Sequence, residues 1–199
     1  MKELVGNIDI YLLDQILKGR YEQCQRILDA GCGAGRNLFY FLKQGKEVYG
    51  VDAKEEAITN LKTWCQAQFS NYPLERFQVQ TIEEMQYEEA FFDVIISNAV
   101  LHFAQNKAQF EQQLQAMWRV LKPKGHLFVR LASSIGLEDN IIAVGAGRFL
   151  LPDESIRFLV TEADLLHYTQ QLGGILTEYI KTTNVQGLRA MTTWCLQKH

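Results

Sequence analysis

The segment LDAGCGAGRN, residues 28–37, places three glycines at alternate positions directly after a short apolar run that includes Ile27 and Leu28. Apolar side chains then recur at helical spacing from Leu38 to Leu42. Glycine allows positive φ and close approach of the backbone, and the free N–H groups of a helix start favour a negative group. An ordinary strand-to-helix turn needs one or two glycines. The segment therefore predicts a strand, a tight loop and a helix start that bind a ligand.

Helix and strand patterns alternate on both sides of this loop. Further strands are expected at 48–51, 77–80, 92–97 and 126–131, and helices at 7–19, 36–43, 57–65 and 110–121. Asn7 is the expected N-cap of the leading helix, and Gly19 its stop. Strands that alternate with helices indicate a parallel sheet with right-handed crossovers.

The carboxyl-terminal part breaks this alternation. A hairpin is expected from 148–151 and 156–160, then a helix from 161 to 172 with Thr161 as cap, then strands at 175–181 and 189–196. The prediction is one domain over residues 1–199, with an α/β fold and a doubly wound, Rossmann-like sheet of about seven strands. That sheet is mostly parallel with an antiparallel C-terminal hairpin, and residues 133–160 form an insertion on the substrate side.

Charge and composition narrow the function classes. The formal net charge is −3, and the 20 lysines and arginines are scattered, so we expect no nucleic acid partner. No apolar run approaches ~18 residues, so we expect no membrane span and no membrane partner. Residues 1–16 lack the pattern of a signal peptide. The 4 cysteines form no C-x-x-C pair and no zinc spacing, which predicts no metal site and a reducing, cytoplasmic location.

Asp52 ends the second expected strand, roughly 20 residues after Gly31, the spacing at which an acidic residue meets a ribose in doubly wound folds. A carboxylate there accepts both ribose hydroxyls, and each charge-assisted hydrogen bond contributes ~1.5–3 kcal/mol. By itself, Asp52 is better explained as a surface aspartate that caps the next helix. Together with the glycines it predicts a nucleoside ligand.

The glycine spacing discriminates between two nucleoside families. A dinucleotide fingerprint, G-x-G-x-x-G/A, needs a small residue where this chain has Arg36. The pattern here is G-x-G-x-G with Asp29 two places before the first glycine. This resembles motif I of the class I S-adenosylmethionine-dependent methyltransferases, of the small single-domain bacterial type. An NAD-dependent oxidoreductase and a non-catalytic protein that binds S-adenosylmethionine remain the alternatives.

The resemblance covers roughly residues 26–196 and implies S-adenosyl-L-methionine as cofactor and S-adenosyl-L-homocysteine as product. It also implies a set of cofactor-binding residues. These are Asp29, Gly31, Gly33 and Asn37 in motif I, Asp52 and Ala53 after the second strand, and Asn98 and Ala99 in FDVIISNAVLHF. Family members often carry an acidic residue after the third strand. Here Ile82 is expected to cover the adenine, with Glu83 as the alternative acidic partner.

The remaining expectations concern the acceptor. By analogy it is a small molecule, and the protein acts as a monomer or homodimer. His102 is the histidine placed to act as general base, although histidines in such loops also orient a neighbouring backbone. Cys32 is expected to pack as a small side chain. The residues expected to reach the acceptor are Tyr11, Ser133, Arg148 and Arg157.

Overall fold

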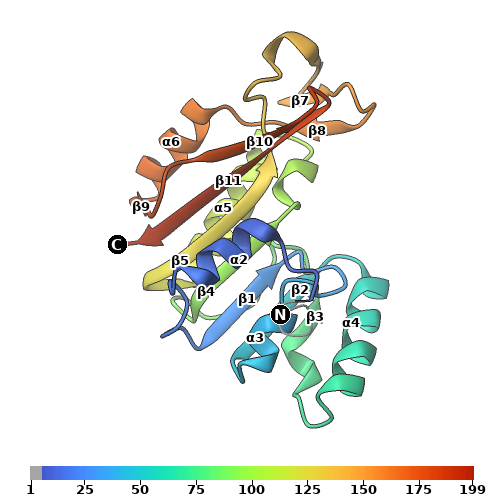
Figure 1. Ribbon diagram of the computed structural model, residues 1–199, viewed down its shortest axis with the longest axis vertical. Coiled ribbons are helices and arrows are strands. Elements are labelled where there is room, and N and C mark those ends of the chain that lie inside the picture. The colour runs from blue at the N-terminus through green and yellow to red at the C-terminus, as the bar shows by residue number, and fades with distance from the viewer. Residues whose placement is uncertain (1–5) are drawn as a thin grey trace.

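A twisted sheet with strand order β10-β11-β5-β4-β1-β2-β3 forms the centre of the protein, and β9 pairs with β11 at its edge (Figure 1). The computed structural model describes residues 6–199. The strands are β1 (Arg26–Ala30), β2 (Glu47–Asp52), β3 (Phe77–Val79), β4 (Phe92–Asn98), β5 (Leu121–Ala132), β9 (Gly174–Leu176), β10 (Lys181–Val185) and β11 (Arg189–Lys198). Strands β1 to β5 are parallel, and β11 runs antiparallel to β5. The predicted doubly wound sheet is confirmed.

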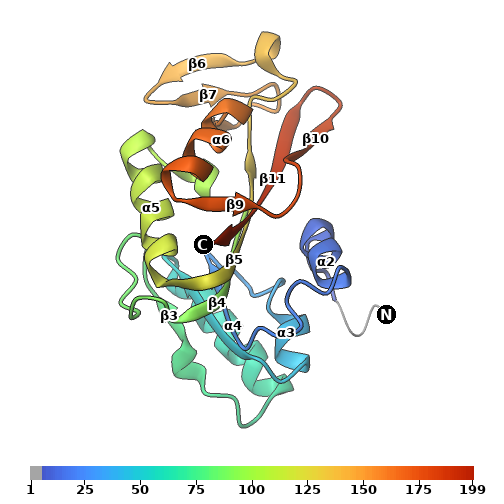
Figure 2. The ribbon, with the colours of Figure 1, turned by 90° about the vertical axis from the view of Figure 1, so that its left-hand side faces the viewer.

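Helices cover both faces of this sheet (Figure 2). On one face lie α2 (Ile10–Leu17), α3 (Phe39–Lys43) and α4 (Glu55–Gln68), and on the other α5 (Lys107–Val120) and α6 (Glu162–Gln171). Successive β5 side chains serve the two cores in turn, because side chains alternate along a strand. Phe128 packs in the core under α2 to α4, and Val129 in the core under α5 and α6. The fully buried Trp194 donates its indole N–H to Thr169 Oγ1 at 2.9 Å, which ties α6 to the sheet.

Residues 133–160 form a second, three-stranded antiparallel sheet of β6 (Ile142–Gly145), β7 (Arg148–Leu150) and β8 (Ile156–Phe158). The predicted hairpin of β7 and β8 is confirmed. The sequence pattern missed β6, because all four of its residues are exposed and no alternation marks it. Figure 2 shows this small sheet beyond the end of β5. Short 3-10 helices are η1 (Leu74–Arg76), η2 (Leu101–Phe103) and η3 (Glu138–Asn140).

The two helices nearest the glycine loop begin later than predicted. Helix α2 is capped by Asp9 and not by Asn7, since Asp9 Oδ1 accepts the Tyr11 N–H at 2.9 Å. Helix α3 begins at Phe39 and not at Arg36, and its cap residue Leu38 supplies no side-chain hydrogen bond. The prediction that a helix begins at the glycine loop, with its dipole directed at a ligand there, is therefore wrong.

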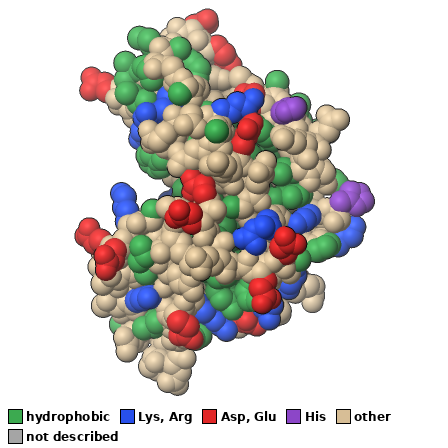
Figure 3. Space-filling model, turned by 180° about the vertical axis from the view of Figure 1, so that it is seen from behind, with side chains coloured by type: hydrophobic (Ala, Val, Ile, Leu, Met, Phe, Trp, Pro, Cys, Tyr) green, Lys and Arg blue, Asp and Glu red, His purple; other side chains and the backbone are tan. Residues whose placement is uncertain are grey.

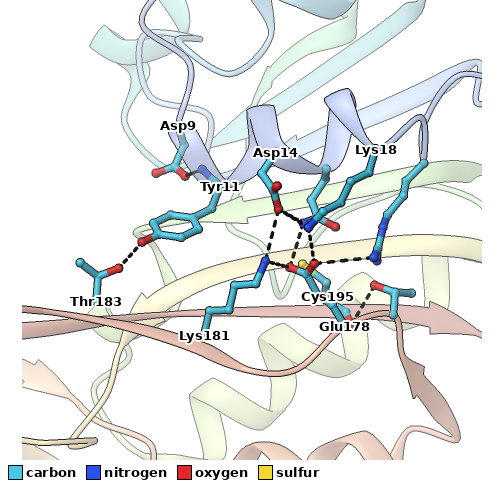
Figure 4. A network of polar contacts seen from close by, with 11 residues as sticks. Asp9, Tyr11, Asp14, Lys18, Glu178, Lys181, Thr183 and Cys195 are labelled. Atoms are coloured by element: carbon cyan, nitrogen blue, oxygen red, sulfur yellow. Dashed lines mark hydrogen bonds and ion pairs between the residues drawn. The ribbon is translucent and has the colours of Figure 1, made fainter.

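The expected strand 175–181 is split into β9 and β10, both paired with β11. Between them, Glu178 lies outside the paired strands. Its carboxylate forms ion pairs with the ammonium groups of Lys18 at 2.7 Å and Lys181 at 3.0 Å. Figure 4 shows this ion-pair network between α2 and β10. These ion pairs tie the segment between β9 and β10 to α2. Among residues 6–199, no helix has the length and apolar character needed to cross a membrane.

Candidate functional site

The glycine loop between β1 and the turn before α3 is held against the end of β2. The N–H groups of Gly31 and Cys32 both donate to the Val51 carbonyl, at 2.8 and 2.9 Å. Gly31 has φ +84°, and a Cβ on it would lie 2.4 Å from Val100 Cγ2. Gly33 has φ +51°, and a Cβ on it would have no atom within 4 Å. Gly31 is therefore required by packing, whereas Gly33 borders open space.

Asp52 lies at the end of β2, beside this loop. Its Oδ2 accepts the Gly33 N–H at 2.8 Å, and its Oδ1 accepts the Lys54 N–H at 2.9 Å. Two backbone donors fix the carboxylate, and each oxygen keeps a further lone pair for a ligand hydroxyl. Ala53 is exposed next to it. The sequence thus located Asp52 correctly relative to the loop, and the structure adds that Asp52 also shapes the loop.

Asp29 is the most unusual group of the site. Its side chain is buried with the residue only 1% exposed, and neither carboxylate oxygen has a hydrogen-bond partner among the described residues. Burial raises the pKa of this carboxyl to about 8, and the nearby Asp52 charge adds to the rise. The charge of Arg36 opposes it, as does the Asn37 side chain, which lies close to Asp29 although its geometry is not that of a normal hydrogen bond. A buried polar group without a partner is costly. The arrangement fits a ligand that brings a cation or an N–H donor to Asp29.

Asn37, Asn98 and Ala99 lie around the same end of the sheet. The Asn98 Oδ1 accepts from Arg36 Nη2 at 3.2 Å, while its buried Nδ2 has no partner among the described residues. Ala99 has φ +60°, and its N–H donates to the Arg130 carbonyl at 2.7 Å. Asn37 is buried, and its Oδ1 accepts the Asp9 N–H at 3.1 Å. The two asparagines thus link the glycine loop to β4 and to the start of α2.

The two residues after β3 that were expected at the adenine, Ile82 and Glu83, have different surroundings. Ile82 is 5% exposed and packs in the core under α5 and α6. Glu83 Oε1 accepts from Gln109 at 2.7 Å and from Gln113 at 3.0 Å, so this carboxylate is engaged by α5. Of the two expected adenine contacts, Glu83 is the one with its oxygen already taken.

His102 lies in η2, directly after β4, and is 5% exposed. Its Nδ1 accepts the Ala132 N–H at 3.1 Å. The proton of the neutral ring is therefore assigned to Nε2. Burial lowers the pKa of His102 to about 4, and the charges of Arg157 and Arg130 add to the decrease. The ring is neutral at pH 7 and its free nitrogen is a donor, so accepting a proton requires the bond to Ala132 to break.

The four expected acceptor residues lie in α2, directly after β5, and in the small sheet. The Tyr11 hydroxyl is hydrogen-bonded to Thr183 of β10 (Figure 4), and Ser133 is buried with its Oγ 2.6 Å from Thr192 Oγ1. Arg148 donates to Gln105 at 3.0 Å, and the Arg157 guanidinium lies 4.8 Å from the centre of the Phe103 ring. Phe103, in η2, is 54% exposed. These contacts join the small sheet to the loop that follows β4.

Figure 3 shows an indentation at one edge of the molecule, between the small sheet above and the α4 side below.

Cys32 packs beneath the glycine loop, with its Sγ 3.0 Å from where a Gly50 Cβ would lie. Burial raises the pKa of its thiol, and Asp29 and Asp52 raise it further. Cys32 is therefore a packed thiol and not a nucleophile. No group of three or more His, Cys, Asp or Glu suited to a metal occurs among residues 6–199.

Comparison with known proteins identifies the family. A sequence model of the methyltransferase domain matches residues 28–129, which include the glycine loop, β4 and most of β5. The chain belongs to this methyltransferase family. The resemblance predicted from motif I is thereby confirmed.

Individual relatives differ in what their names say they methylate. An arsenite methyltransferase from Mus musculus is 31% identical over 120 residues, covering 55% of this chain and 31% of that protein. A tRNA 5-carboxymethoxyuridine methyltransferase from Escherichia coli (strain K12) is 27% identical over 125 residues, covering 63% and 47%. This methyltransferase chain spans less than half of either relative. The expected absence of a nucleic acid partner thus stays a prediction.

Among solved structures, the 1,6-didemethyltoxoflavin-N1-methyltransferase of Burkholderia thailandensis, with S-adenosylhomocysteine bound, matches with a TM-score of 0.70 and 22% identity. The match covers 92% of this chain and 75% of that one. It supports the fold of this chain.

Two charged residues at the site were missed by the sequence analysis as site residues. Asp9 Oδ2 lies 3.4 Å from Arg130 Nη1 and 3.7 Å from Arg36 Nη2. Asp9 was assigned only to a helix pattern, and Arg130 only to a strand. The signal in the sequence was the arginine, Arg130, near the end of an otherwise apolar strand. Its partner Asp9 is 121 positions away along the chain.

Proposed function

We propose that this chain transfers a methyl group from S-adenosylmethionine to a small-molecule acceptor, with S-adenosylhomocysteine as product. The observation that carries the proposal is the Asp29 carboxyl, which is buried without a hydrogen bond of normal geometry at the end of β1, where the chain enters the glycine loop. A bound ammonium group at this point would satisfy the carboxylate and lower its pKa. The α-amino group of the cofactor's methionine part has this chemistry.

The other residues extend the same assignment along the cofactor. Asp52 would accept the ribose hydroxyls, in keeping with its position at the end of β2 beside the loop. Ala53 and Ile82 would flank the adenine, and Gly31, Asn37, Asn98 and Ala99 would border the methionine part. The support is that these residues lie at or after the carboxyl ends of β1 to β4, where open α/β sheets bind ligands.

The chemistry demands little acid–base work from the chain. S-adenosylmethionine supplies a methyl group that its sulfonium already makes electrophilic. The protein has to hold the acceptor in line, which contributes ~7–11 kcal/mol when the geometry is right. We assign His102 the positioning of the end of β5 through Ala132, because its Nδ1 already accepts that N–H. Removal of a proton from the acceptor by His102 is the alternative.

The acceptor side is assigned to the start of α2 and to residues 133–160. Arg157, stacked on the exposed Phe103, and Arg148 connect the small sheet to η2 at the end of β4. We further propose that this domain acts on small molecules in the cytoplasm, as a monomer or homodimer. A methyl-transfer assay that offers tRNA in one reaction and small acceptors in another tests the proposal of a small-molecule acceptor.

The first test is calorimetric titration with S-adenosylmethionine, S-adenosylhomocysteine and NAD in parallel. Micromolar binding of the first two alone supports the proposal, whereas binding of NAD alone overturns the assignment of the loop. Release of S-adenosylhomocysteine with a panel of acceptors then separates an enzyme from a protein that only binds the cofactor. Turnover of tRNA alone would overturn the small-molecule part.

A further inference from the structure

Two guanidinium groups meet one carboxylate at the carboxyl ends of β4 and β5. Arg36 comes from the glycine loop, Arg130 from β5 and Asp9 from the cap of α2. The Asp9 carboxylate lies 3.4 Å from Arg130 and 3.7 Å from Arg36, which is ion-pair distance without a hydrogen bond. The other carboxylate oxygen, Asp9 Oδ1, accepts the Tyr11 N–H that caps α2. The two guanidinium groups therefore keep N–H donors that Asp9 does not use.

Two unpaired donors at this place are buried, one on Arg130 and one on Asn98 of the neighbouring strand. Arg130 Nε and Asn98 Nδ2 each have less than 1 Å² of exposed surface and no hydrogen-bond partner among the described residues. Asn98 and Arg130 are register partners of β4 and β5, so their side chains leave the sheet on the same face. Asn98 is 7% exposed, and the Arg130 side chain is 17% exposed. Unpaired buried donors side by side require an acceptor group.

The packing around Arg130 holds its guanidinium in place. Its Cζ lies 5.0 Å from the centre of the Tyr11 ring, and the Tyr11 hydroxyl is bonded to Thr183. Figure 4 shows Asp9 and Tyr11 together at the start of α2, with Thr183 on β10 opposite them. A fixed guanidinium loses little entropy when it binds an oxyanion, because its planar fork matches the two oxygens.

We propose that Arg130 and Arg36, next to Asn98 at the edge of the methionine site, form a subsite for an oxyanion of the methyl acceptor, a carboxylate or phosphate group, with Asp9 as the internal carboxylate that it displaces. This inference rests on the proposed function, because it assigns a substrate class to the same site. It selects acceptors that carry an acidic group near the methylated atom. Neutral analogues, such as the matching amides, leave the buried donors unpaired and bind more weakly.

The test measures anion binding directly, with inorganic phosphate as probe and the rise of Tm as readout. Chloride at equal ionic strength is the reference. Protein saturated with S-adenosylhomocysteine is expected to gain about 2–4 °C at millimolar phosphate. Arg130→Gln is expected to abolish the gain, whereas Arg189→Gln, which removes an equal charge from an exposed position of β11, should retain it.

Asp9→Asn gives a result of opposite sign. Asparagine caps a helix as well as aspartate does, so α2 keeps its start while the competing negative charge is lost. Phosphate affinity is expected to rise at least threefold in this variant. A purely structural role for the cluster predicts that both Asp9→Asn and Arg130→Gln weaken the response.

Three results overturn the inference: no gain with phosphate, a gain that survives Arg130→Gln, or a gain in the free protein that S-adenosylhomocysteine abolishes. The last result would assign these donors to the carboxylate of the cofactor itself. A failure of S-adenosylhomocysteine alone to raise Tm counts against the proposed function instead, and the phosphate titration of the free protein still tests the subsite.

Discussion

The backbone N–H of Gly33 donates a 2.8 Å hydrogen bond to Oδ2 of Asp52. This bond joins the glycine loop after β1 to the end of β2, so the two sequence signals for a nucleoside are also one structural unit. A ligand that contacts Asp52 therefore also meets the open side of Gly33.

Asp52→Ala is expected to weaken S-adenosylmethionine binding at least tenfold, about 1.4 kcal/mol. The variant removes both the ribose acceptor and the bond that holds the Gly33 N–H. Calorimetric titration measures the change, with Glu56→Ala, an exposed carboxylate in the first turn of α4, as the control. Equal affinity in Asp52→Ala and in the unaltered protein would contradict the ribose assignment.

Gly31→Ala and Gly33→Ala should fail in different ways. A Cβ at position 31 meets Val100 at 2.4 Å, so Gly31→Ala should lower the free energy of unfolding by more than ~2 kcal/mol. Gly33→Ala has open space and a positive φ, which costs ~1–2 kcal/mol, but the methyl group enters the ligand space. Urea denaturation and cofactor titration of both variants separate stability from binding. Unimpaired binding by Gly33→Ala would show that the ligand lies elsewhere.

Asp29→Asn should stabilise the ligand-free protein and weaken cofactor binding. The folded pKa of about 8 lies above the ordinary value of 3.8, so the carboxyl's contribution to stability is present below pH ~4 and is lost as pH rises toward 8. The asparagine variant does not titrate and should exceed the unaltered protein by at least ~1 kcal/mol at pH 9. Urea denaturation at pH 5 and 9 measures this. An Asp29→Asn variant that is less stable at pH 9 contradicts the assignment of an unpaired carboxyl.

His102→Asn should reduce the loss of stability in acid. The folded pKa of about 4 lies below the ordinary 6.5, so the histidine's contribution is present above pH ~6.5 and is lost as pH falls toward 4, by up to ~3 kcal/mol. Asparagine keeps an acceptor for the Ala132 N–H without titrating. Unfolding curves between pH 4 and 7 give the slope. The same variant tests the chemistry, because a turnover that falls at least 100-fold with intact cofactor binding would identify His102 as the base.

Much of the fold could be predicted because local signals and global packing agree. The apolar run 92–97 became β4, and the Thr161 capping box starts α6 as expected. Prediction failed where long-range contacts decided the backbone. The pairing of Glu178 with Lys18 breaks the expected strand 175–181, and no property of that segment alone encodes a lysine 160 positions away.

The sequence by itself determined the fold class, the glycine loop and the likeness to methyltransferases, because glycine spacing, apolar periodicity and the position of Asp52 are local properties of the chain. Only the tertiary structure decided the states of the site's charged groups. Asp29 became an unpaired buried carboxyl, His102 a backbone acceptor, and Asp9 the partner of Arg36 and Arg130. Burial and partners set the pKa and the hydrogen bonds of a polar group, and both arise from segments that meet only in the folded chain.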